Sequence, residues 1–175
     1  MRIEADAKIP FPRDVVFAAY RDNLPNLVQY LPNVKSITVL ERKDEGNVCK
    51  LKNEWWAKGE IPKAAQSVIK PEMLSWYDHA EWFQETFSNK WRIQMRVMEK
   101  VVSCQGGNSF EVDGTGTVLK IRGDLNLDMK EVPGVPRFLA GTIGPTVEKF
   151  VVGMLKPNLV EVSKGIEQYL RAKGS

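Results

Sequence analysis

The sequence predicts an α+β protein in which a curved antiparallel sheet of about seven strands wraps around one long C-terminal helix, with two short helices after the first strand. Two observations predict this class. Residues 34–128 are dominated by alternating apolar and polar positions interrupted by short turns, and the chain after residue 136 changes to helical spacing. The 175 residues, 43% of them hydrophobic, suit one domain that covers residues 1–175.

The first predicted strand covers residues 2–9, because apolar and charged side chains alternate there. Pro10 and Pro12 end this strand, since proline cannot donate a hydrogen bond to a neighbouring strand. Pro12 also suits the first turn of a helix, which we expect to reach about Asp22. A second short helix is predicted at about residues 24–31.

Alternation with a period of two returns at residue 34. In the first of these strands we expect Val34 and Ser36 to share one face and Ile37 to take the other. Turn signals separate the strands, such as Asp113-Gly114, whose glycine tolerates a positive φ. The repeated short spacing indicates an antiparallel meander. The predicted strands cover residues 34–44, 48–57, 61–70, 74–83, 90–98, 101–112 and 117–128.

Two glycine pairs fall within the last two strands or between them. Gly106-Gly107 is predicted to form a β-bulge, and Gly114 and Gly116 a hairpin turn. Neither pair fits a phosphate-binding loop, because neither opens a helix directly after a strand.

The C-terminal helix carries one long apolar stripe, and the dry face of the sheet is the surface against which we expect it to pack. A proline inside a helix costs about 3 kcal/mol through a lost hydrogen bond and a ring clash. We therefore expect a kink between Met154 and Pro157. Residues 133–144, rich in proline and glycine, form either a lid over a pocket mouth or a plain connector.

The order of these elements resembles the START-like helix-grip superfamily, also called the polyketide cyclase/dehydrase and lipid transport superfamily (SRPBCC). The resemblance covers residues 3–170, and none of its markers is a catalytic signature. It implies a helix-grip fold with a deep cavity between sheet and C-terminal helix, which members use for lipid or sterol carriage, ligand sensing or polyketide cyclisation. The markers are Pro12, Val15-Val16-Phe17, Asn23-Leu24-Pro25, the passage 30–37, Cys104-Gln105-Gly106, Thr117 and the run 121–125.

Four of the five tryptophans share strand parity with apolar neighbours, and they either line a pocket or belong to ordinary core. Trp56 has the opposite parity and is predicted on the outer face. Asp78 has the parity of Trp76, where burial would raise its pKa and an arginine or a wet cavity mouth would accommodate it. The predicted ligand-binding residues are Asn53, Trp55, Trp76, Asp78, Trp82, Trp91, Ile93, Met95, Leu119, Ile121, Phe150 and Met154.

Histidine and cysteine chemistry finds little support in the sequence. His79 is the only histidine, and its parity places it on the outer face. Cys49 and Cys104 lie far apart without metal-ligand spacing, and their apolar surroundings favour a reducing, cytoplasmic compartment. We therefore predict no catalytic residue, no metal and no cofactor.

The predicted function is binding of a hydrophobic small molecule, such as a lipid, a sterol or a polyketide-like compound, for carriage or sensing. The alternative is an aromatase/cyclase-like enzyme for a polyketide-type substrate, with Asn53, Tyr77 or Asp78 moving protons. A third hypothesis, a protein-interaction module, predicts a collapsed core and an exposed apolar patch.

Charge and hydropathy narrow the range of partners. The net charge is only +3, with scattered basic residues, and gives no indication of nucleic-acid binding. No apolar run reaches the roughly 18 residues that span a bilayer. We expect a monomer or homodimer that makes at most transient membrane contact.

Overall fold

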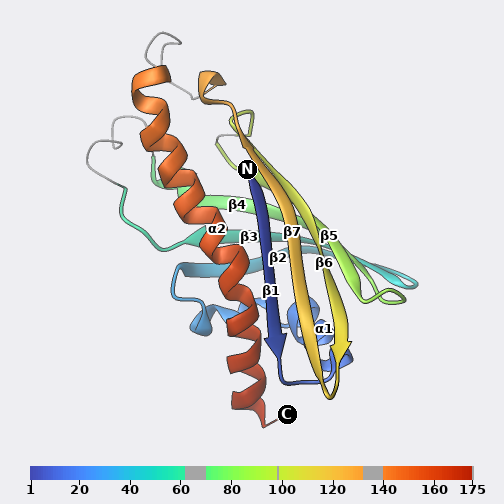
Figure 1. The fold of residues 1–175 in the computed structure, drawn as a ribbon. Helices are drawn as coiled ribbons and strands as arrows, with labels where there is room; N and C mark the ends of the chain where they lie inside the picture. Colours follow the sequence, from blue (N-terminus) through green and yellow to red (C-terminus); the bar gives the residue numbers. More distant parts are fainter. Residues whose placement is uncertain (62–69, 98, 132–139, 175) are drawn as a thin grey trace.

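The structure is a computed structural model, and it describes residues 1–61, 70–97, 99–131 and 140–174. Figure 1 shows an open sheet with the long helix α2 lying across one of its faces, which confirms the predicted α+β class and the helix-grip arrangement. The antiparallel sheet has the order β1-β7-β6-β5-β4-β3-β2. Its strands are β1 (Arg2–Ile9), β2 (Val34–Glu45), β3 (Val48–Ala57), β4 (Ser75–Phe83), β5 (Ser88–Met95), β6 (Val102–Asp113) and β7 (Gly116–Leu127).

The helical elements follow the predicted order. Helix α1 (Arg13–Asp22) begins after Pro12, and the second predicted helix is a 3-10 helix, η1 (Leu24–Tyr30). Charges at both ends of α1 suit its dipole, with Asp14 in the first turn and Arg21 in the last. The remaining elements are the short 3-10 helices η3 (Pro71–Leu74) and η4 (Met129–Glu131), and α2 (Ala140–Lys173).

Strand β2 breaks the alternation predicted for it. Its pairing with β3 shifts register between Val34 and Ser36 and again between Val39 and Glu41. A bulge adds one residue to one strand, so side-chain parity reverses beyond it. Ile37 is consequently buried on the same face as Val34, and the predicted face of Ile37 was wrong.

The bulge predicted at Gly106-Gly107 is also wrong, because β5 and β6 pair there without a register shift. Gly106 and Gly123 have no side chains, and this makes room for the Trp91 indole. An added Cβ would lie 2.5 Å from Trp91 Cζ2 if placed on Gly106, and 2.6 Å from Trp91 Cη2 if placed on Gly123. Both distances are too short for real atoms, so these two glycines of β6 and β7 form a seat for the tryptophan.

Helix α2 is continuous and contains both Pro145 and Pro157. Continuity of the helix does not test the kink expected between Met154 and Pro157, which stays a prediction. The side chain of Asn158 donates a hydrogen bond to the Met154 carbonyl oxygen at 2.8 Å, one turn earlier. Buried side chains of α2 follow one stripe, and the helix packs against α1, η1, β1 and β7. The stripe includes Val147, Val151, Leu155, Val162 and Ile166.

Two predictions concern residues most of which the structure does not describe. Most of the strand predicted at 61–70 and most of the lid or connector at 133–144 lie outside the described residues. The helices that the structure describes include none with both the length and the apolar content needed to cross a membrane.

Candidate functional site

A small cavity lies between the inner face of the sheet, α1, η1 and α2. Its volume is about 30 Å³, which is room for one or two water molecules. Aromatic and aliphatic side chains make up most of its wall, and a few polar groups interrupt it. The described residues that line it are Tyr20, Leu24, Trp55, Trp76, Asp78, Ala80, Trp82, Asn89, Trp91, Ile93, Leu155, Asn158 and Leu159.

The structure brings together half of the predicted ligand-binding residues. Trp55, Trp76, Asp78, Trp82, Trp91 and Ile93 line the cavity. The other predicted residues lie elsewhere: Asn53, Met95, Leu119, Ile121 and Met154 are buried away from it, and Phe150 is half-buried on α2.

Several lining residues were missed by the sequence reasoning. Ala80 and Asn89 have the strand parity of their tryptophan neighbours, so parity could have found them. Tyr20, Leu24 and Asn158 carry no such signal. Their position depends on how α1, η1 and α2 close over the sheet, and this packing has no counterpart in the local sequence pattern.

Asp78 is the only charged residue among the described residues of the cavity wall. Its side chain is partly accessible, and Asn53 Nδ2 donates a hydrogen bond to its Oδ2 at 3.2 Å. Burial raises the pKa of Asp78 to about 6, although Asn53 and the nearby Trp55 N–H act in the opposite direction. The predicted rise in pKa is therefore supported, and an amide rather than an arginine contacts the carboxylate.

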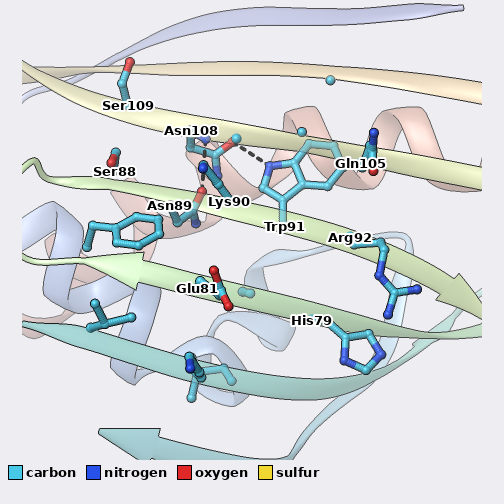
Figure 2. A pocket seen from close by; sticks show the side chains of 18 of the residues that line it. His79, Glu81, Ser88, Asn89, Lys90, Trp91, Arg92, Gln105, Asn108 and Ser109 are labelled. Carbon is cyan, nitrogen blue, oxygen red and sulfur yellow. Dashed lines mark hydrogen bonds between the residues drawn. The ribbon is translucent and has the colours of Figure 1, made fainter. Parts of the chain in front are cut away.

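A chain of polar contacts joins the wall to β6. Trp91 Nε1 donates to Asn108 Oδ1 at 3.1 Å, and the Asn108 backbone N–H donates to Asn89 Oδ1 at 3.0 Å, as the dashed lines in Figure 2 show. Tyr20 of α1 also interacts with Asn108, and this hydrogen bond lowers the pKa of Tyr20. Burial and the charge of Asp78 outweigh that effect and raise the pKa of Tyr20 above its ordinary value.

Other polar atoms of this region lack partners. Within the described chain, Trp55 Nε1, Trp82 Nε1 and Asn53 Oδ1 are buried without a partner at hydrogen-bonding geometry. The Trp55 N–H is nevertheless close enough to Asp78 to lower the pKa of that carboxyl. A buried polar group without a partner costs about 1–3 kcal/mol, so a bound molecule that supplies one is favoured.

The opposite face of the sheet forms a far larger hollow of about 1770 Å³, which is open to solvent and rimmed by charges (Figure 2). His79 lies there, as predicted, with Nε2 at 3.0 Å from Gln94 Oε1. Lysines of this face pair with carboxylates, for example Lys50 Nζ with Glu45 at 2.8 Å. Such a wide, wet surface cannot remove an apolar molecule from water, so the inner cavity is the better candidate site.

Metal binding and disulfide formation find no geometry among the described residues. No three histidine, cysteine, aspartate or glutamate side chains within them gather in a way that would hold a metal ion. Cys49 and Cys104 are both free and buried.

No protein-family model matches the chain, and no curated protein matches it. Solved structures do share its fold. TTHA0849 from Thermus thermophilus is 22% identical with a TM-score of 0.70, and the alignment covers 100% of both chains. The Zhui aromatase/cyclase from Streptomyces sp. R1128 is 17% identical with a TM-score of 0.60, over 100% of this chain and 98% of that one.

A norcoclaurine synthase point mutant from Thalictrum flavum, solved in complex with a transition state analogue, also shares the fold. It is 12% identical with a TM-score of 0.58, over 100% of this chain and 96% of that one. At these identities the likeness shows a common helix-grip architecture.

Proposed function

We propose that the chain binds a hydrophobic small molecule, of the lipid, sterol or polyketide-like kind, between the inner face of the sheet and α2, for carriage or sensing. The observation that carries this proposal is the cavity wall. Four tryptophans surround the space, and among the described residues the buried Trp82 N–H has no hydrogen-bond partner. Apolar and aromatic walls with a few converging polar groups are typical of small-molecule sites.

A ligand larger than a few atoms needs more than the 30 Å³ that the cavity offers. Leu155, Asn158 and Leu159 of α2 line the cavity on either side of Pro157. Proline has no backbone N–H, so the helix lacks one hydrogen bond at this point. We propose that this part of α2 moves outward when a ligand enters.

The distribution of exposed apolar side chains supports a ligand-binding protein over an interaction module. Among the described residues, the large exposed ones come from four places in the chain, and only two of them are neighbours in sequence. They are Met1, Val39, Leu40, Val97 and Val112.

Native mass spectrometry of the freshly purified protein, followed by extraction of bound material, tests the proposal. We expect a reproducible apolar adduct that is released on denaturation. Ala80→Val, which adds two carbon atoms to the wall, should lose the adduct, whereas Val112→Ala on the exposed surface should keep it. A clean apo mass, with no thermal shift against lipids, sterols and aromatic polyketides, would contradict ligand binding.

The second candidate is an aromatase/cyclase-like enzyme, and the proximity of Asp78 to Tyr20 favours it. A carboxyl with a pKa of about 6 can exchange a proton near neutral pH, and the Tyr20 hydroxyl can donate a hydrogen bond to a developing oxyanion. Tyr77 was also predicted as a residue that moves protons, but it cannot do so in this cavity, because it lies on the outer face beneath Lys52 and Arg96. Asp78→Asn should abolish turnover of a linear polyketide-type substrate and leave its binding measurable.

We also propose that residues 1–175 form one domain, acting in the cytoplasm as a monomer or homodimer. Light scattering after size-exclusion chromatography gives the assembly state. Limited proteolysis tests the single domain, which should yield no stable fragment of half size.

A further inference from the structure

The described part of the cavity wall carries a negatively charged group but no positively charged one. Its described residues include five aromatic side chains and one carboxyl, Asp78, but no lysine, arginine or histidine. The contacts that stabilise the ionised carboxylate come from neutral groups, the Asn53 amide and the Trp55 N–H. Asp78 is therefore a negative charge that faces an apolar space without a positive partner among those residues.

Other titratable groups near Asp78 do not supply a positive charge either. Burial raises the pKa of Tyr20 on α1 and of Cys104 on β6, the latter to about 12. The charge of Asp78 raises both pKa values further, so both groups are neutral between pH 5 and 8. The lining residues of α2 are Leu155, Asn158 and Leu159, none of which titrates. Across this pH range, Asp78 is the group of this set that changes its charge, because its pKa is about 6.

A ligand cation would satisfy several of these groups at once. A carboxylate that lacks a positively charged partner is costly to bury, and an ammonium group beside it offsets that cost. Aromatic rings attract cations over their faces, and tryptophan does so most strongly. A ligand carboxylate would instead meet the charge of Asp78 and be rejected.

We propose that this cavity selects hydrophobic ligands that carry a cationic amine, with the ammonium group against Asp78 and the apolar body among the tryptophans. The inference rests on the proposed function, since it specifies the chemical class of the ligand for the same cavity. It assigns Asp78 a role in binding that needs no chemical step.

Three probes of similar size and different charge test this selection: 2-phenylethylamine, 2-phenylethanol and 3-phenylpropanoate. Isothermal titration calorimetry on the full chain at pH 7.5 should show the amine binding about tenfold more tightly than the alcohol, which corresponds to one favourable charged contact, and the acid binding most weakly. At pH 5.0 the amine stays protonated but Asp78 does not stay ionised, so the preference for the amine should largely disappear.

Asp78→Asn should bind amine and alcohol equally at both pH values. Its matched control is Asp124→Asn, since Asp124 is exposed on β7, and this variant should keep the preference for the amine. Circular dichroism establishes that each variant is folded. If Asp78→Asn does not fold, the pH 5.0 titration of the unaltered chain tests the same charge.

The outcomes separate this inference from the proposed function. Equal binding of amine and alcohol at pH 7.5, or a preference that survives in folded Asp78→Asn, overturns the selection for amines and leaves hydrophobic binding intact. Binding of lipids, sterols or polyketides without binding of the amine overturns it as well. Failure of every apolar compound to bind overturns both proposals.

Discussion

Charged side chains on the two faces of β3, β4 and β5 have different surroundings. On the outer face, Lys52, His79 and Arg92 are cross-strand neighbours in a broad hollow open to water. On the inner face, one residue further along, Asn53 and Asp78 are cross-strand neighbours beside a cavity of about 30 Å³. Outer charges are solvated and many pair with each other, whereas the inner carboxylate has no positively charged group beside it among the described residues of the cavity wall.

The contrast shows why the size of a hollow is a poor guide to function here. The outer hollow is wide, but ion pairs in water contribute little, about 0–1 kcal/mol each. The inner cavity is narrow, but each unpartnered polar atom in it costs more than a surface ion pair contributes. Substitutions on the two faces should therefore differ in their effects, and the following predictions run from the largest effect to the smallest.

Gly123→Ala should give the largest loss of stability. The new Cβ would lie 2.6 Å from Trp91 Cη2 and 2.9 Å from the Gln105 carbonyl oxygen, so the indole or the strand must move. We expect the free energy of unfolding to fall by about 3 kcal/mol, measured by urea denaturation. Gly59→Ala is the control, because its Cβ would meet no atom within 4 Å, and equal losses in the two variants would disprove the seat for Trp91.

Asp78→Asn should stabilise the protein at neutral pH. The pKa of Asp78 rises from 3.8 to about 6 on folding, so its contribution to stability is fully present below pH 3.8 and is lost as the pH rises through 6. At pH 7.5 the neutral variant avoids this loss, which we place on the order of 2 kcal/mol because the side chain is partly accessible. Thermal unfolding at pH 7.5 and pH 4 measures the difference, and equal gains at both pH values would contradict it.

Much of the fold could be predicted because strand parity and turn residues are local signals. Alternation and turn residues predicted the bounds of β1 and β3, and helical spacing placed the helices in the order of the elements. The bulges of β2 could not, because a register shift depends on the partner strand. The role of Gly106 was missed for the same reason, since Trp91 lies on a neighbouring strand and reaches the glycine only after pairing.

The candidate site could likewise be predicted only in part, because strand parity is local and helix packing is not. Parity placed Trp55, Trp76 and Trp82 on the inner face. It gave equal weight to Leu119 and Ile121, which are buried outside the cavity. Parity identifies a face, and only the packing of the helices decides which part of that face stays open.

Two conservative tryptophan substitutions should differ by about 1 kcal/mol. Trp91→Phe leaves the buried Asn108 Oδ1 without the indole donor that it accepts from. Trp82→Phe removes an N–H that has no partner among the described residues, so it should cost less. Parallel urea denaturation of both variants checks this, and a larger loss for Trp82→Phe would show that its N–H does have a partner in solution.

Lys52→Gln, on the outer face, should have the smallest effect. Its Nζ lies 3.4 Å from Glu41, and both side chains are accessible to water. The free energy of unfolding should change by no more than about 0.5 kcal/mol, and ligand affinity should not change. A loss above about 1 kcal/mol in urea denaturation would mean that the outer face also contributes substantially to stability.

The register shifts of β2 have a consequence for solubility. Among the strands that the structure describes, β2 lies at one edge of the sheet, where unpaired backbone groups are a template for another extended chain. Its shifts near Lys35 and Leu40 interrupt the regular spacing of those groups, and a flat strand cannot pair across such breaks. We therefore expect the β2 edge to resist edge-to-edge aggregation at high concentration.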